Sequence, residues 1–184
     1  MSIVRMKRFT SILLSLVLVA VISACGDDSG SSEFTGNEVS MTMIPGTVDG
    51  NTTTGSLLIR ERNDGMAQIE ITLNNVLDGA QHPVHLHFGS LEDDGEVATF
   101  LTTLSEENGV GRSMTILDRL DNDETLTFNQ LVTFNGSVKI HFEASGPLEN
   151  EVLAAANIGL NTGGNEAYLL GLKGITSCNS KAGN

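Results

Sequence analysis

The chain has 184 residues and a formal net charge of −13 at pH 7, from 10 lysines and arginines against 23 aspartates and glutamates. That balance argues against nucleic acid as a partner, because an acidic surface repels phosphate. The length suits one domain with a real core. Tryptophan is absent and aromatic residues make up only 4% of the chain, so we expect a core of Val, Ile, Leu and Met together with the seven Phe.

Residues 1–24 are predicted to be a signal peptide. The basic start MSIVRMKR precedes an apolar stretch that is too short and too close to the N-terminus for a convincing structural span. The stretch ends in ISAC, which resembles the lipobox of bacterial lipoproteins. The resemblance implies lipidation of Cys25 and membrane anchoring in the bacterial cell envelope, and Gly26 favours the outer membrane, on its periplasmic or surface face. The alternative is an ordinary secretory signal or a single membrane anchor.

Residues 25–37 are small, polar and acidic, which predicts a flexible tether. From residue 38 apolar residues alternate with a period of two, and turn residues interrupt them at short intervals. RNDG (62–65) is predicted to be a hairpin turn, because Asp-Gly suits positive φ angles. The predicted strands are EVSMTMIPG (38–46), TTGSLLIRE (53–61), MAQIEITLNNV (66–76), PVHLHFG (83–89), EVATFLTTL (96–104), GRSMTILD (111–118), SVKIHFEA (137–144) and EVLAAANIG (151–159).

Short strands at this spacing predict an all-β sandwich or barrel for residues 38–160. Within it, residues 121–136 are ambiguous and could hold one helical turn. Residues 161–184 are predicted to be a C-terminal extension, in which EAYLLGLKGI could form one edge strand. If Cys25 is lipidated, Cys178 has no partner inside the chain, so a free thiol and an intermolecular bridge both stay open.

Three of the four histidines lie in HPVHLHFG, residues 82–89. Alternate side chains of a strand share a face, so Val84, Leu86 and Phe88 are predicted to face the core. His85 and His87 then share the opposite face. Two residues of strand rise separate their Cα atoms by about 6.5 Å, which suits chelation of one ion.

The strand SVKIHFEA repeats this logic and adds a third imidazole. If it neighbours the first strand, His141 completes a cluster with His85 and His87. Three imidazoles suit copper, zinc, nickel or iron and leave one coordination position open. The alternative is a polar strand face whose histidines bond to backbone or water. In SVKIHFEA the residues predicted to face the core are Val138, Ile140 and Phe142, and those predicted to face outward are Ser137, Lys139, His141 and Glu143.

The region LNNVLDGAQHPVHLHFGS resembles the Cu,Zn superoxide dismutases, in which a Gly-containing turn leads into H-x-x-H-x-H. SVKIHFEASGPLENEVLAAANIG is similar to a later dismutase strand with a histidine, its loop, and a strand ending in Ile-Gly. The match is closer still to CHRD (chordin-type) domains of bacterial lipoproteins. Over residues 38–160 the resemblance implies a Greek-key β-sandwich or barrel of about eight strands. It also implies copper ligation by His85, His87 and His141, with His82 supporting the site by hydrogen bonding.

Departures from the dismutase pattern argue against dismutase activity. No histidine lies between His87 and His141, so the bridging ligand and the zinc subsite are missing. Val152 stands where dismutases have an arginine that guides the anion, and Ala155 stands where they have a disulfide cysteine. The negative net charge also works against steering an anionic substrate.

No other catalytic constellation is found, and no catalytic residue is predicted. LEDDGE (91–96) lacks the register of a calcium loop and is predicted to be a solvated acidic turn. The predicted function is therefore a non-catalytic binding module on an envelope lipoprotein, with a site for one copper ion or another transition metal. A copper-dependent redox enzyme, and an adhesion or scaffold module that binds a protein or glycan without metal, are the alternatives.

Overall fold

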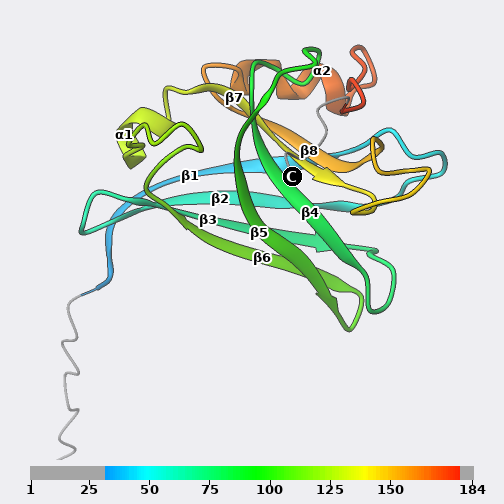
Figure 1. Ribbon diagram of the computed structural model, residues 1–184, viewed down its shortest axis with the longest axis horizontal. Coiled ribbons are helices and arrows are strands. Elements are labelled where there is room, and N and C mark those ends of the chain that lie inside the picture. Colours follow the sequence, from blue (N-terminus) through cyan, green and yellow to red (C-terminus); the bar gives the residue numbers. More distant parts are fainter. Residues whose placement is uncertain (1–31, 179–184) are drawn as a thin grey trace, which may run out of the picture. The chain divides into compact units, whose positions relative to one another are not determined.

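The computed structural model describes residues 32–178, and a compact unit begins at Ser32 (Figure 1). The predicted signal peptide and the lipidation site Cys25 lie outside the described residues. Eight antiparallel strands close into a barrel, which confirms the predicted all-β fold. The strands are β1 Phe34–Pro45, β2 Thr54–Arg62, β3 Ala67–Asn74, β4 Gln81–Phe88, β5 Val97–Glu107, β6 Val110–Leu117, β7 Asn135–His141 and β8 Val152–Gly159; the helices are α1 Phe128–Leu131, the 3-10 turn Thr162–Gly164 and α2 Asn165–Leu169.

The order of the strands around the barrel is β1-β2-β3-β6-β5-β4-β7-β8, which contains a Greek key. β4, β5 and β6 follow one another as antiparallel neighbours, and β7 returns to lie beside β4. In that pairing His85 lies opposite Lys139 and His87 lies opposite Ser137. The topology therefore places the two histidines of β4 next to the strand that ends in His141.

Aliphatic side chains fill the barrel interior. The alternation along β3 illustrates this, since Ala67, Ile69, Ile71 and Leu73 are each at most 2% exposed and belong to the core. The expectation that phenylalanines share this role is largely wrong: within residues 32–178 only Phe128, at 5% exposure, is buried. The other phenylalanines lie at strand ends, on the outer surface or at the edge of the core, because the interior between the strands is already filled by branched aliphatic side chains.

The predicted inward faces of β4 and β7 are correct except at the end of β4. Val84 and Leu86 are at most 1% exposed, and Val138 and Ile140 are fully buried. Phe88 is instead 39% exposed, because it is the last residue of β4 and packs against Phe134 outside the core, with ring centroids 5.4 Å apart. Phe142 follows the end of β7 and packs only partly buried against the core.

This difference predicts unequal costs for two substitutions in β4. Leu86→Ala should lower the free energy of unfolding by about 2–5 kcal/mol, because it removes a fully buried side chain and leaves a cavity. Phe88→Ala should cost less than half as much, since its ring already contacts water. Chemical denaturation of both variants tests this, and equal losses would contradict the observed burial.

Two local sequence predictions are confirmed. The RNDG turn joins β2 to β3, with Gly65 at φ 83° and its N–H donating to the carbonyl of Arg62 over 2.9 Å. The ambiguous segment 121–136 does hold one helical turn, α1. Thr127 and Gln130 cap it reciprocally, which explains why the turn begins there.

The two ends of the predicted domain differ from expectation. β1 begins at Phe34, inside the segment predicted as a tether. The predicted edge strand of residues 166–175 is wrong, because its first part forms α2. β1 pairs with β8 and closes the barrel, so no free edge is left for another strand, and Tyr168 packs instead against the outside of the barrel. In the described part of the chain, no helix has the length and apolar composition that crossing a membrane requires.

Candidate metal centre

The structure brings the three predicted ligand histidines together. His85 and His87 come from β4 and His141 is the last residue of β7. Each offers one ring nitrogen, and these three nitrogens all lie within 4.8 Å of one another. The ring centroids are 4.4 Å apart for His85 and His141, 5.8 Å for His85 and His87, and 6.2 Å for His87 and His141. We call these three residues the histidine cluster.

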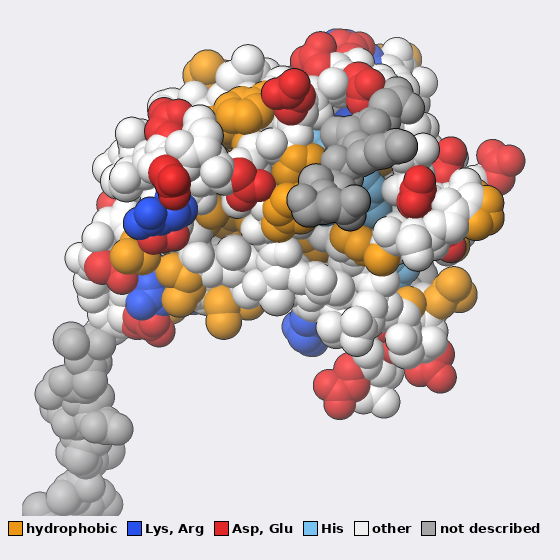
Figure 2. All heavy atoms as spheres, viewed as in Figure 1, with side chains coloured by type: hydrophobic (Ala, Val, Ile, Leu, Met, Phe, Trp, Pro, Cys, Tyr) orange, Lys and Arg blue, Asp and Glu red, His pale blue; other side chains and the backbone are white. Residues whose placement is uncertain are grey.

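The cluster lies outside the barrel wall, yet it is shielded from water. His85, His87 and His141 are between 1% and 4% exposed. Patches of histidine can be seen among acidic side chains in Figure 2. Three stretches of chain form an outer layer beside it: the loop 89–96 after β4, the loop 142–151 between β7 and β8, and the C-terminal segment 170–178. A small apolar cluster joins this layer to the outside of the barrel, with Leu91 and Cys178 from the layer, Ile44 from β1, Val152 and Ala155 from β8, and Tyr168 from α2.

The loop 89–96 is more than the solvated acidic turn predicted from LEDDGE. Its carboxylate side chains are exposed, as expected, but Leu91 is fully buried. Its backbone also reaches the site, because the carbonyl of Gly95 accepts a hydrogen bond from Nδ1 of His87 over 2.9 Å. The carbonyl of Asp93 accepts from the buried ammonium group of Lys139 over 3.3 Å. The acidic side chains of the loop give no indication that its main chain orients His87.

Backbone carbonyls select the tautomers of two cluster histidines. Nδ1 of His87 donates to Gly95, and Nδ1 of His141 donates to the carbonyl of Glu149 over 2.9 Å. A carbonyl oxygen only accepts, so in each neutral ring the proton is on Nδ1 and Nε2 carries the lone pair. Fixing the ring in this way is typical of histidines that bind metals.

Two nitrogens of the cluster are buried without a hydrogen-bond partner. These are Nδ1 of His85 and Nε2 of His141. Leaving a buried polar atom unsatisfied costs about 1–3 kcal/mol, so such atoms call for an explanation. A metal ion would satisfy both at once, and imidazole is a suitable ligand for copper, zinc, nickel and iron. The residues present therefore fit a transition-metal ion.

Burial keeps the cluster neutral. It is the main reason why the pKa of His85 is lowered to about 3 and that of His87 to about 4, and it also lowers the pKa of His141. The neighbouring imidazoles add to the effect at His85, and the charge of Lys139 adds to it at His87. Neutral imidazole is the form that binds metal, so no proton has to leave these rings at neutral pH.

These pKa values predict an acid-sensitive metal-free protein. In the unfolded chain a histidine has its ordinary pKa of 6.5, far above the values of about 3 and about 4 in the fold. The unfolded state therefore takes up protons first as the pH falls. Stability should be fully present above about pH 6.5 and should decrease below it, by up to about 1.4 kcal/mol per pH unit for each such histidine.

Denaturation of the chelator-treated protein between about pH 7 and about pH 5 checks this prediction. A variant with His85→Ala and His87→Ala should show a flatter dependence. The same pH dependence in parent and variant would show that other groups cause the acid sensitivity.

His82 lies beside the cluster but is not one of its members. It is 3% exposed, and its Nδ1 donates to the carbonyls of His141 and Phe142 over 3.1 and 2.7 Å. These bonds let His82 hold the backbone at the end of β7, from which the side chain of His141 extends into the site. The sequence predicts a supporting role for His82 by hydrogen bonding, and the contacts it makes reach the main chain of His141 and not its ring.

Cys178 is the site residue that the sequence did not reveal. It was expected in a polar tail, yet it is 1% exposed and its sulfur lies 3.9 Å from Nε2 of His87. Such burial argues against an intermolecular bridge, and Cys178 is a free thiol within the described residues. Strand periodicity carries no signal for this contact, because the C-terminal segment is neither helix nor strand at this point.

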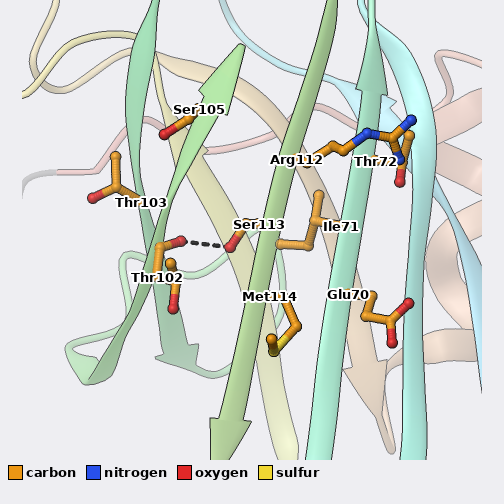
Figure 3. A pocket seen from close by; sticks show the side chains of 9 residues that line it. All are labelled: Glu70, Ile71, Thr72, Thr102, Thr103, Ser105, Arg112, Ser113 and Met114. Atoms are coloured by element: carbon orange, nitrogen blue, oxygen red, sulfur yellow. Dashed lines mark hydrogen bonds between the residues drawn. The ribbon is translucent and has the colours of Figure 1, made fainter. Parts of the chain in front are cut away.

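A surface hollow lies away from the cluster, over β3, β5 and β6 (Figure 3). It measures about 480 Å³ and contains one carboxylate, Glu70, and one guanidinium, Arg112. Ser113 donates to the carbonyl of Thr102 over 2.5 Å across it. Its lining includes no histidine or cysteine, so this hollow offers neither an imidazole nor a thiolate to a transition-metal ion.

Comparison of the chain with models of protein families, with curated proteins and with solved structures found no match. The case for function therefore depends on the geometry of the site and on the motifs of the sequence.

Proposed function

We propose that this protein is a cell-envelope lipoprotein with a CHRD-like domain that binds one transition-metal ion, copper or zinc, through His85, His87 and His141. The observation that carries the proposal is the pair of buried, unpartnered nitrogens on His85 and His141. They belong to a cluster whose ligand atoms lie within 4.8 Å of one another. Backbone hydrogen bonds hold the other two Nδ1 atoms of the cluster, so the lone pairs of Nε2 are free to bind an ion.

Binding is a better account of this site than redox catalysis. A dismutase needs access for superoxide and a cation that attracts it. Here Val152, at the position where the resemblance expects the guiding arginine, is fully buried, and the imidazoles are covered by the outer layer. The chain also carries a net charge of −13, which repels an anion. The copper-loaded protein should therefore show no more superoxide turnover than the same concentration of copper bound to an unrelated carrier protein.

The envelope location is proposed from the signal-like N-terminus and the ISAC motif. Several acyl chains on one cysteine would anchor the protein durably in a membrane. Cys25→Ser in the full chain should abolish incorporation of labelled fatty acid, because the sulfur that would carry an acyl chain is gone. Equal labelling of parent and variant would contradict lipid anchoring at this residue.

The metal content of the protein as isolated tests the function as a whole. The full chain would be purified from membranes without chelators or added metal, beside a variant with all three cluster histidines replaced by alanine. We expect about one transition-metal ion per chain in the parent and none above background in the variant, and elemental analysis would identify the ion. Equal metal content in the two proteins would contradict the proposal.

A further inference from the structure

We propose that Cys178 is the fourth ligand, so that the metal is held by three imidazoles and one thiolate. This inference rests on the proposed metal-binding function and adds the residue that completes the site. The first support is distance, since the sulfur is 3.9 Å from Nε2 of His87. With metal–nitrogen bonds of about 2.0 Å and a metal–sulfur bond of about 2.3 Å, a tetrahedral ion would separate these two atoms by about 3.5 Å. The sulfur is therefore a few tenths of an ångström farther from Nε2 of His87 than a shared tetrahedral ion requires.

The second support is that the chain around Cys178 is held against the site by its backbone. The N–H of Thr176 donates to the carbonyl of Leu91 over 2.9 Å, and that of Cys178 donates to the carbonyl of Asn150 over 3.0 Å. The hydroxyl of Thr176 also donates to the carbonyl of Glu92 over 2.7 Å. The loops that accept these bonds are the same two that orient His87 and His141. The same two loops therefore position the thiol of Cys178 and the imidazoles of His87 and His141.

The third support is the set of unpartnered atoms in the histidine cluster. Nδ1 of His85 and Nε2 of His141 have no hydrogen-bond partner, in side chains that are at least 96% buried. Nε2 of His87 has the thiol of Cys178 as its neighbour, and because its Nδ1 already donates to Gly95, Nε2 can only accept the S–H proton. On metal binding that proton leaves to solvent, and the ion takes its place between sulfur and nitrogen.

Charge gives a fourth reason for a thiolate. The ammonium group of Lys139 is 1% exposed and acts electrostatically on both His87 and Cys178, and the carboxylate of Asp94 acts on the same two groups with the opposite sign. Asp94 is exposed whereas the ammonium group is buried, so three neutral imidazoles would leave a divalent ion with its full charge beside a buried cation. One thiolate lowers the local positive charge by one unit. Lys139 therefore favours a ligand set that includes an anion.

A fourth protein ligand changes what the site can do. Three imidazoles alone leave an open position, as in catalytic zinc sites, whereas four protein ligands close the coordination shell. Thiolate also shifts the preference of the site toward zinc and cuprous copper. The inference therefore assigns a closed site that holds its ion and has no position for a substrate.

Cobalt spectroscopy tests this ligand directly. In residues 26–184, which contain the whole barrel, Cys178 is the only cysteine, so a sulfur-to-cobalt charge-transfer band can come from no other residue. With one equivalent of Co(II) and a reductant that contains no thiol, the parent should show this near-ultraviolet band. Cys178→Ser should bind cobalt without the band and should bind Zn(II) at least about 10-fold more weakly. Ser113→Ala, on β6 outside the cluster, should behave like the parent.

The possible results separate this inference from the proposed function. If the parent binds one equivalent without the band and Cys178→Ser binds zinc equally well, the three-histidine site stands and the fourth ligand is wrong. If the parent binds neither cobalt nor zinc, both are wrong. Cys178→Ala and circular dichroism of all variants in chelator guard against misfolding: a folded Cys178→Ala variant that keeps the band would also overturn the assignment.

Discussion

Replacing His87 with alanine should weaken Zn(II) binding by at least about 100-fold, which is more than the roughly 10- to 100-fold that loss of an outer hydrogen-bond partner usually costs. His87 has two connections to the site. Its Nδ1 is fixed by Gly95 and its Nε2 faces the sulfur of Cys178. The alanine variant therefore loses a metal ligand and also the imidazole that contacts the thiol of Cys178. Competition with a chromophoric chelator measures the change.

His82→Ala is the matched control for this prediction. His82 is as deeply buried as the cluster histidines, but its contacts are with the carbonyls of His141 and Phe142. Its loss should weaken zinc binding by only about 10-fold, because the three ligand nitrogens stay in place. Equal losses in the two variants would mean that affinity follows general packing around β4 and not ligation by His87.

Metal should also stabilise the fold strongly. The ligands come from β4 and β7, which are distant in sequence and adjacent only in the folded barrel, so the unfolded chain has no preformed site. At a free metal concentration of 100 times Kd, binding adds about 2.7 kcal/mol to the free energy of unfolding. For a domain of this size that corresponds to a rise in Tm of about 5–10 °C.

Thermal unfolding with and without Zn(II) measures this rise, and the variant with all three cluster histidines replaced should show none. The comparison is informative because nonspecific binding to the 23 acidic residues would affect both proteins alike. A similar rise in both proteins would assign the stabilisation to the acidic surface.

The sequence predicts the barrel well because the relevant information is local. Period-two alternation depends on the geometry of a single strand, and it places His85 and His87 on one face without knowledge of the rest of the chain. The third ligand follows by the same rule once β4 and β7 are neighbours. Alternation cannot say what covers that face. Alternation also cannot say where along a strand the core ends. Phe88 continues the alternation of β4, but it is the last residue of the strand and lies beyond the core.

The outer layer could not be predicted, since its contacts join loops that are far apart in sequence. Asp93, Glu149 and Thr176 each offer a backbone carbonyl to a side chain of the site. Any residue has such a carbonyl, so the side chains of these loops give no sign of the role. The same reason explains why Cys178 looked like part of a polar tail. Its position is fixed by backbone hydrogen bonds of Cys178 and Thr176, and these cannot be read from the composition of the segment.

The most direct test of the central claim is a titration of residues 26–184 with Zn(II) and Cu(II), beside the variant in which His85, His87 and His141 are all alanine. We predict that the parent binds one equivalent tightly and that the variant does not. Equal and weak binding by both proteins would contradict a metal centre. The buried histidines of HPVHLHFG would then be a structural feature of the barrel, and the ligand to look for would be a protein or a glycan.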